Sequence, residues 1–261
     1  MKTIGLIGGM SWQSTRTYYD LLNEMVAARL GGLHSAEILM RSVDFAGLEA
    51  AMQRGEWTAI ESRLGDEAAA LEQGGADCVL LCSNTMHKLY GRIATRIGIP
   101  FFHIADALGH ALAADGLTRV GLLGTRFTMV EDFYATRLRE GFGIDVILPD
   151  EGQIGRIDAV IFDELCRGIV EDSSRNSYLE IMDGLAARGA EGIILGCTEI
   201  EMLVKPEHHA LPLYDTTLLH ARHAVEWALS GDWQFLIVAG RGCASVVSVF
   251  QRAWPASVWR P

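Results

Sequence analysis

Two residues able to carry protons occupy equivalent positions in a segment that this chain contains twice. Residues 75–85 align without gaps on residues 189–199, and in this register Ser83 faces Cys197. Each of the two follows a short apolar run typical of a buried strand. A hydroxyl and a thiol at equivalent strand ends predict a cleft in which a substrate meets one proton carrier on each side.

Two further pairs of segments indicate the same internal duplication. Residues 4–8 match residues 120–124, and residues 99–102 match residues 211–214, in the same order as the first pair. A single match would mean little, because many buried strands read Ile-Gly-Leu-Ile. Three matches in one order predict a duplicated structural unit.

Short apolar runs alternate with stretches of helical period, which predicts an α/β fold with two pseudo-symmetric lobes. Each lobe is expected to hold a mainly parallel sheet flanked by helices, the first over 1–114 and the second over 115–229. The last helix of the second lobe can pack back on the first. Residues 230–261 break the pattern and are interpreted as an atypical tail: an added strand pair, a subunit contact or a segment without a native role. Strands are expected over residues 3–7, 36–42, 78–82, 101–103, 119–123, 145–148, 192–195 and 213–214, and helices over 14–29, 57–73, 106–114, 129–141, 157–169, 175–188 and 216–229.

The composition argues against several classes of function. The net charge is −11 and no basic stretch occurs, which argues against nucleic acid and against an anionic membrane surface as partners. No apolar run approaches the roughly 18 residues of a membrane span, and the first apolar run is too short for a secretory signal. The five cysteines form no C-x-x-C pair, so neither a disulfide framework nor a zinc site is expected, and a cytoplasmic location fits best.

Small polar residues follow four of the expected strands. They stand in residues 8–11, 83–85, 124–128 and 197–198, each before a helical stretch. Ligands of open parallel sheets bind beyond the carboxyl ends of the strands, where helix N-termini favour a carboxylate or a phosphate. The first of these loops lacks G-x-G-x-x-G, so a nucleotide is not expected there.

Cys197 is the cysteine best placed for chemistry. It follows an apolar strand and precedes an expected helix start, a position where the pKa of a thiol falls below its usual value of about 8.5. Glu199 and Glu201 would oppose that shift if they faced the thiol. Cys78 and Cys166 are interpreted as inert core residues, which is the more common state of a lone cysteine.

Four motifs in these loops carry a resemblance to a known family. They are Gly-Gly-Met-Ser-Trp at 8–12, Asn-Thr-Met-His at 84–87, Gly-Thr-x-x-Thr at 124–128 and Gly-Cys-Thr-Glu at 196–199. Together they resemble the aspartate/glutamate racemase family over about residues 1–229, most closely its bacterial branch for acidic or broader amino acids. The resemblance implies an enzyme without a cofactor, usually a homodimer, with a proton carrier on each face of the substrate Cα.

The resemblance and the strand-end positions together define a candidate site. In the family the first carrier is usually a cysteine directly before Asn-Thr, whereas this chain has a serine there, and the branch that it most resembles also carries a hydroxyl residue. Some members hold carboxylates with a basic residue; among Arg54, Arg126 and Arg167, Arg126 ranks first because it lies within a matching motif. The expected proton carriers are Cys197 and Ser83, and the expected substrate-binding residues are Met10, Ser11, Asn84, Thr85, Thr125, Arg126, Thr128, Thr198 and Glu199.

Serine in place of the first cysteine changes the expected mechanism. Taking a hydroxyl near the pKa of water, about 15.7, and a thiol near about 8.5, the gap of about 7 units is roughly 10 kcal/mol of basicity. Ser83 is therefore interpreted as a proton donor, directly or through a water, rather than as a resting base. Cys197, as thiolate, is assigned by the resemblance to the L-isomer. Backbone amides and hydroxyls must stabilise the enediolate, because no cofactor delocalises the charge.

Two alternatives stay open at this point. A malonate decarboxylase or a maleate isomerase of the same fold would use similar proton or thiol chemistry beside a carboxylate. A protein that binds small acids without turnover would need only the binding residues. In each case the expected partner is a small molecule, an amino acid for the racemase.

Overall fold

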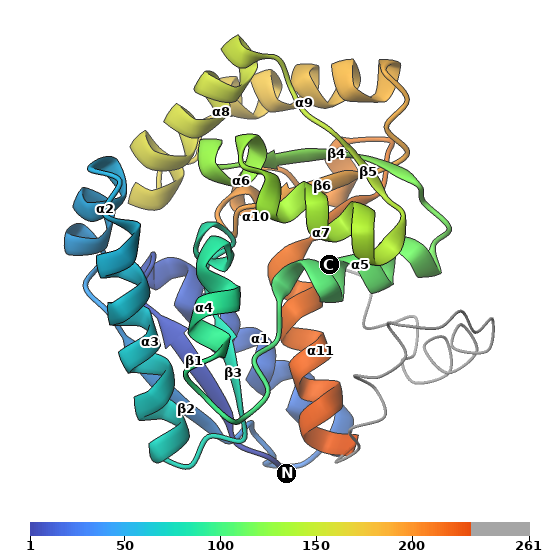
Figure 1. Ribbon diagram of the computed structural model, residues 1–261. Coiled ribbons are helices and arrows are strands. Elements are labelled where there is room, and N and C mark those ends of the chain that lie inside the picture. Colours follow the sequence, from blue (N-terminus) through green and yellow to red (C-terminus); the bar gives the residue numbers. More distant parts are fainter. Residues whose placement is uncertain (231–261) are drawn as a thin grey trace.

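The computed structural model describes residues 1–230, so nearly all of the predicted tail lies outside the described residues. Two parallel sheets form the centres of two lobes, one above the other in Figure 1. The first sheet has the strand order β2-β1-β3 and the second has the order β5-β4-β6-β7. The predicted α/β fold class is confirmed. The strands are β1 (Ile4–Gly8), β2 (Ile38–Ser42), β3 (Cys78–Leu81), β4 (Arg119–Gly124), β5 (Asp145–Ile147), β6 (Ile193–Gly196) and β7 (Leu213–Asp215).

Seven of the eight expected strands form, and the eighth is reduced to an isolated bridge. Phe101 pairs in parallel with Val79 beside β3, in the place that β7 takes beside β6. The segment then turns at once into a helix, because the His103 side chain accepts a hydrogen bond from the Ala105 amide and caps it. The two sheets thus share one strand order; the duplication itself stays a prediction.

The helices flank the sheets, and two of them differ clearly from their predicted ranges. The helix expected over 129–141 is divided at Glu131 into α6 (Arg126–Val130) and α7 (Asp132–Phe142). The helix expected over 157–169 begins at Glu151, because Asp150 and Gln153 form a reciprocal capping box at its N-terminus. It ends at Asp163. Two short helices, α2 and α4, were not expected. The main helices are α1 (Trp12–Leu30), α2 (Phe45–Gln53), α3 (Trp57–Gln73), α4 (Tyr90–Ala94), α5 (Ile104–Ala114), α6 (Arg126–Val130), α7 (Asp132–Phe142), α8 (Glu151–Asp163), α9 (Asp172–Ala187), α10 (Ile200–Leu203) and α11 (Thr216–Ser230), with 3₁₀ turns η1 (Thr85–Leu89), η2 (Leu165–Arg167) and η3 (Pro206–His208).

The lobes exchange the helices that follow their sheets. α5 follows the first sheet, but its buried side chains, Leu108 and Leu112 among them, join the core of the second lobe. α11 follows the second sheet and packs beside α1, where Val225 joins the core of the first lobe and the Lys2 amide donates to the Ala228 carbonyl at 3.1 Å (Figure 1). The boundary at residues 114–115 stays a prediction, and the exchange ties the lobes together.

Strand register sets where the loops meet. Ile7 lies opposite Leu81 in the first sheet, and Gly124 lies opposite Gly196 in the second. Neighbouring parallel strands therefore end side by side, and the loops after β1 and β3 come together, as do those after β4 and β6. Within residues 1–230 no helix combines the length and the apolar character needed to cross a bilayer.

Candidate active site

A small cavity between the lobes is lined by the loops that follow β1, β3, β4 and β6. Its volume is about 40 Å³, enough for a few waters but too small for an amino acid. The conformation described is therefore closed, and a substrate enters only if the lobes or their covering helices move apart. The lining residues are Met10, Ser11, Phe45, Met52, Ser83, Asn84, Thr85, Met86, Thr125, Ile161, Phe162, Cys166, Gly196, Cys197, Thr198 and Glu199.

The structure brings most of the predicted site residues to this one cavity. Ser83 and Cys197 both line it, one from each lobe. Thr128 does not line the cavity but contacts two hydroxyls that do. Trp12, the last residue of the Gly-Gly-Met-Ser-Trp motif, does not line the cavity and is 62% exposed. The predicted residues found in the lining are Met10, Ser11, Ser83, Asn84, Thr85, Thr125, Cys197, Thr198 and Glu199.

Arg126 lies outside the cavity, which corrects the expectation that it holds a carboxylate there. Its guanidinium is exposed and forms an ion pair with Glu151, while its backbone amide donates to Asp158 at 2.7 Å. The loop that places Thr125 in the cavity turns the next side chain outward. The other two candidates are no closer, since Arg54 pairs with Glu56 and Arg167 pairs with Asp163.

A buried carboxylate sits at the centre of the cavity wall. Glu199 accepts hydrogen bonds from the Ser11 hydroxyl at 2.5 Å, the Thr198 hydroxyl at 2.6 Å and the Cys197 thiol at 3.0 Å. The Ser11 bond joins the lobes, because Ser11 caps α1 in the first lobe. The carboxylate is 4% exposed, and these three donors offset the loss of its hydration.

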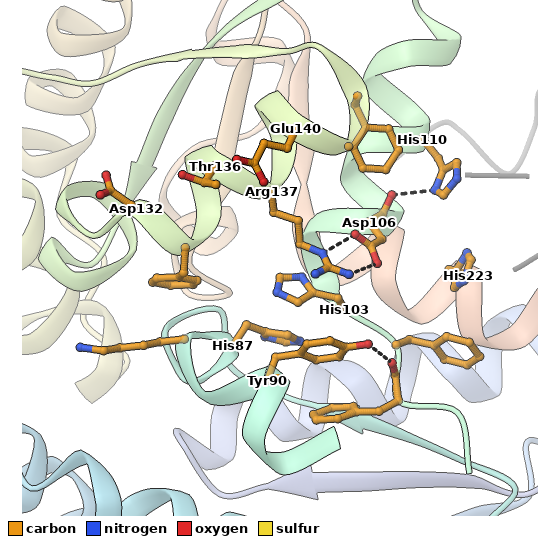
Figure 2. Close-up of a pocket in the computed structure, with 17 residues that line it drawn as sticks. His87, Tyr90, His103, Asp106, His110, Asp132, Thr136, Arg137, Glu140 and His223 are labelled. Carbon is orange, nitrogen blue, oxygen red and sulfur yellow. Dashed lines mark hydrogen bonds and ion pairs between the residues drawn. The ribbon is translucent and has the colours of Figure 1, made fainter. Parts of the chain in front are cut away.

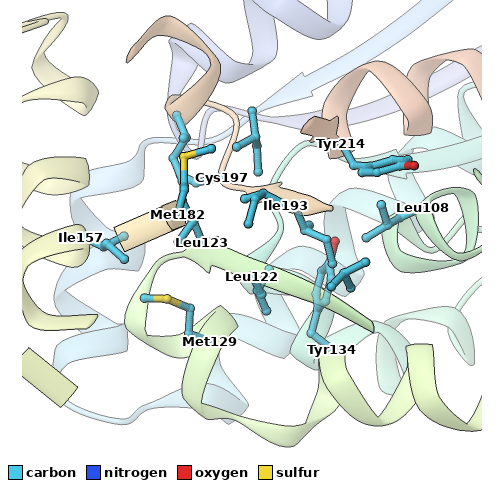
Figure 3. Packing of buried hydrophobic residues seen from close by; sticks show 14 of the residues in the cluster. Leu108, Leu122, Leu123, Met129, Tyr134, Ile157, Met182, Ile193, Cys197 and Tyr214 are labelled. Carbon is cyan, nitrogen blue, oxygen red and sulfur yellow. The ribbon is translucent and has the colours of Figure 1, made fainter. Parts of the chain in front are cut away.

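The Cys197 thiol is protonated at rest, which corrects the expected fall of its pKa. Burial raises the pKa of Cys197 well above its usual value, and the negative charge of Glu199 raises it further. Figure 3 shows Cys197 beside Met182 and Leu123 in the core of the second lobe. The helix start expected after Cys197 is α10, which begins only at Ile200 and has four residues, so its dipole is weak.

Three threonine hydroxyls form a cluster across the lobe boundary. Thr85 from the first lobe shares hydrogen bonds with Thr125 at 2.9 Å and Thr128 at 3.3 Å, and those two share one at 3.1 Å. All three are buried, and Thr125 also caps α6 by accepting from the Thr128 amide. Hydroxyls can rotate between donating and accepting, so this cluster can turn donors toward an anion in the cavity.

Asn84 lines the cavity and carries a buried hydrogen-bond acceptor that has no partner among the described residues. Its side-chain nitrogen donates to the Thr216 hydroxyl at 3.0 Å, which in turn donates to the Leu195 carbonyl at 2.9 Å. These bonds fix the amide orientation. The side-chain oxygen of Asn84 is buried and accepts from no atom of the described residues. A buried acceptor left in this state favours a ligand that brings an N–H or O–H group.

A histidine forms a hydrogen bond with the backbone of Ser83. The His87 Nδ1–H donates to the Ser83 carbonyl at 2.8 Å, and Nε2 accepts from the Ile104 amide at 3.3 Å. Burial lowers the pKa of His87 to about 4, so the ring is neutral near pH 7. His87 therefore fixes the loop through its backbone and does not line the cavity of Cys197.

His87 instead faces a second, larger hollow. Its volume is about 730 Å³, and Figure 2 shows the Arg137–Asp106 ion pair, His103, His110 and aromatic rings around it. The two ion-pair hydrogen bonds measure 2.5 and 2.6 Å. None of the predicted site residues lines this hollow. The residues predicted to carry the chemistry therefore line the small cavity and not this larger hollow.

Sequence reasoning missed the apolar residues of the cavity. Phe45 and Met52 lie on α2, which was not predicted, and Ile161 and Phe162 lie on α8. Their sequence pattern is that of ordinary core residues, so no local signal could distinguish them. Cys166, interpreted as inert, also lines the cavity, and its backbone carbonyl accepts from the Gln13 side chain at 3.1 Å across the lobe boundary.

The two α/β lobes enclose a thiol, a carboxylate and hydroxyls in one cavity, which is a set of groups suited to acid–base chemistry. Comparison with known families is consistent with this chemistry. The model of the Asp/Glu/hydantoin racemase family matches residues 7–224, and the chain belongs to this family.

Individual relatives agree with the family assignment. The chain is 44% identical to a candidate Asp/Glu racemase from Yersinia pestis, with a TM-score of 0.83 over 88% of this chain and 100% of that one. An aspartate racemase homologue from Pyrococcus horikoshii OT3 is 29% identical, with a TM-score of 0.77 over the same shares. A broad specificity amino-acid racemase from Bacillus subtilis (strain 168) is 26% identical over 63% of this chain and 70% of the relative. These likenesses support amino-acid racemase activity.

Proposed function

We propose that this protein is a cofactor-independent amino-acid racemase that moves the Cα proton between Cys197 and the Ser83 side. The observation that carries the proposal is that Ser83 and Cys197, at the ends of β3 and β6, line one cavity from opposite lobes. Racemisation requires a proton to leave one face of Cα and another to arrive on the opposite face. A site with one carrier in each lobe meets that requirement.

Cys197 removes the proton from the L-isomer after Glu199 has taken the thiol proton. The thiol already donates to the Glu199 carboxylate at 3.0 Å, so the acceptor is in place. Because burial raises the pKa of Cys197, few molecules carry the thiolate before a substrate binds. The α-ammonium group of the substrate then stabilises the thiolate by charge attraction.

The substrate's ammonium and carboxylate groups meet different parts of the wall. The Asn84 side-chain oxygen accepts from the ammonium group, which supplies the partner that this buried atom lacks. The hydroxyls of Thr85 and Thr125 and the backbone around Thr198 face the carboxylate and stabilise the enediolate that forms on proton loss.

The Ser83 side completes the reaction by protonating the other face. A hydroxyl is a poor base but can donate to a carbanion, directly or through a water that it positions. The proton taken from Cα stays on Cys197. Glu199 releases the proton that it holds, and solvent carries a proton back to the donor on the Ser83 side. Since enantiomers have equal free energy in solution, kcat/KM must be the same in both directions, while kcat and KM can differ.

Proton NMR in D2O with a panel of L- and D-amino acids tests the proposal. We expect loss of the Cα proton signal with formation of the enantiomer, and equal kcat/KM values from the two sides. Malonate and maleate in the same panel test the two alternatives, a decarboxylase and an isomerase. Consumption of either of those acids without any amino-acid exchange would reject the racemase, and binding of amino acids without exchange would indicate a binding protein.

A further inference from the structure

Part of the cavity lining is apolar. Five apolar residues of the lining, called here the apolar end, come from three elements: Phe45 and Met52 from α2, Ile161 and Phe162 from α8, and Met86 from η1. Figure 1 shows α2 close to one end of α8, and both helices supply residues to the cavity lining. The polar groups that can bind an ammonium and a carboxylate lie on the strand-end loops instead. The side chain of a substrate bound there is left with the apolar end.

No cation reaches this cavity from the described residues. Its lining contains no lysine, arginine or histidine in residues 1–230. The three arginines that the sequence offered as carboxylate ligands form ion pairs on the outer surface. Arg126 pairs with Glu151, Arg54 pairs with Glu56 at 2.7 Å, and Arg167 pairs with Asp163 at 3.5 Å. The acidic side chain in this lining is Glu199, whose charge raises the pKa of Cys197.

A second carboxylate on the substrate would therefore be poorly matched to the site. It would leave water for contacts with Phe45, Met52 and Phe162, without an opposite charge or a fixed donor to replace its hydration. It would also lie in the same closed cavity as Glu199, and two like charges repel strongly where water is excluded. The α-carboxylate does not meet this problem, because the threonine hydroxyls and the loop amides face it.

We propose, on the basis of the racemase function above, that the site takes α-amino acids with uncharged side chains in preference to aspartate and glutamate. Methionine, leucine and glutamine are suitable probes of the apolar end. The residues that set this preference are Phe45, Met52, Ile161 and Phe162, and Glu199 adds to it by repulsion.

Matched substrate pairs test the preference. Glutamine and glutamate, and likewise asparagine and aspartate, have nearly the same shape and differ in charge, so their ratio isolates the electrostatic effect. We expect kcat/KM for Cα exchange to be at least about tenfold higher for the neutral member of each pair, and methionine to exceed glutamate by more. Glutamate or aspartate turned over as fast as its amide would overturn the proposal.

A substitution at the half-buried Phe162 tests the assignment of the apolar end. Phe162→Arg brings a cation to the cavity and should move the glutamine-to-glutamate ratio toward glutamate by about tenfold or more. Phe162→Met, the matched control, changes the shape without charge and should leave the ratio within about threefold. An unchanged ratio in a folded Phe162→Arg variant would contradict the assignment. If that variant fails to fold by circular dichroism, Phe45→Arg with Phe45→Met repeats the comparison from the other helix.

The preference and the racemase function fail in different ways. If no amino acid exchanges its Cα proton, the racemase proposal is rejected, and the same pairs are compared by saturation-transfer NMR for binding alone. Tighter binding of the amides would then support the uncharged end of the cavity without turnover. Equal or tighter binding of the acids would reject it.

Discussion

The ends of β3 and β6 occupy equivalent places in the two lobes and have opposite surroundings. Cys197 after β6 is buried and donates its thiol hydrogen to Glu199. Ser83 after β3 is half-buried, and its backbone carbonyl accepts from the neutral ring of His87. In the repeat register the position of Glu199 corresponds to Thr85, which shares bonds with threonines and brings no charge. Among residues 1–230, the structure shows a hydrogen bond to a carboxylate from the Cys197 thiol and none from the Ser83 hydroxyl.

This difference separates the roles that two identical carriers would share. A weakly acidic thiol next to a carboxylate can become a base when a substrate arrives, whereas a hydroxyl without a base beside it can only donate or position a donor. The lobe that has the better base is also the one that buries it. The site is thus asymmetric in chemistry while the sheets around it share one strand order.

Replacing the thiol should have the largest effect on this asymmetry. Cys197→Ala removes the base and should lower Cα exchange of the L-isomer by at least about 10³-fold, since general bases contribute about 10²–10⁴-fold. Cys166→Ala is the matched control, because Cys166 lines the same cavity and its pKa is raised by burial to about 12. We expect its activity within about threefold of the parent. Exchange that survives in Cys197→Ala would place the base elsewhere.

Neutralising the carboxylate should have the next largest effect. Glu199→Gln keeps the shape but cannot take the thiol proton, so exchange should fall by about 10²-fold. Because the charge of Glu199 raises the Cys197 pKa, its removal should also shift the rise of exchange with pH to lower pH.

Glu201→Gln is the control for the Glu199 variant. Burial and the neighbouring Asp215 raise the Glu201 pKa, which favours the neutral form of this carboxyl. Its pH profile between pH 6 and 8 should match the parent. A Glu199→Gln profile that falls in rate without moving along the pH axis would show that Glu199 only holds Cys197 in position.

Changes at Ser83 should have a smaller and more selective effect. Ser83→Ala should slow racemisation by about tenfold while Cα exchange of the L-isomer falls less, because Cys197 still removes and returns a proton on its own face. Ser83→Cys places a better acid on that side and should restore racemisation. Both rates are read in one NMR experiment in D2O, and equal losses of exchange and racemisation in Ser83→Ala would contradict the asymmetric roles.

Acid should weaken the Ser83 side of the molecule through its buried histidines. Burial lowers the pKa values of His87 and His223 to about 4, whereas unfolded histidines titrate near about 6.5. The unfolded chain therefore binds more protons between these values, so stability is complete above about pH 6.5 and falls as the pH drops toward 4. Each histidine accounts for on the order of 3 kcal/mol at most.

Thermal unfolding at pH 7.5 and pH 5 measures this effect. We expect Tm to fall by several degrees at pH 5. His103 and His220 lie close to the His87 ring, with centroids 4.7 and 5.6 Å away, so charging one ring makes charging the next more costly. His87→Gln removes one titrating ring and should reduce the fall. The same Tm at both pH values would show that these histidines are not neutral in the folded state.

The amino-acid sequence determined the alternation of strands and helices and the polar strand ends. Strand apolarity and helical period are local, so the ranges of β1, β3, β4 and β6 followed directly from residues that neighbour each other in the chain. Parallel pairing then required that their carboxyl ends share an edge, and Ser83 and Cys197 were therefore expected in one cleft. Nine of the eleven candidate residues line the same cavity for this reason.

Only the tertiary structure decided the electrostatics and the side-chain end of the site. The Cys197 pKa depends on burial among distant core residues and on the direction in which Glu199 points, and Ser11 comes from the other lobe to bind that carboxylate. Arg126 lies outside the cavity because neighbouring residues in the loop, Thr125 and Arg126, point their side chains in different directions. The apolar wall of Phe45 and Phe162 joins segments that are neighbours only in space, and such contacts leave no pattern within either segment.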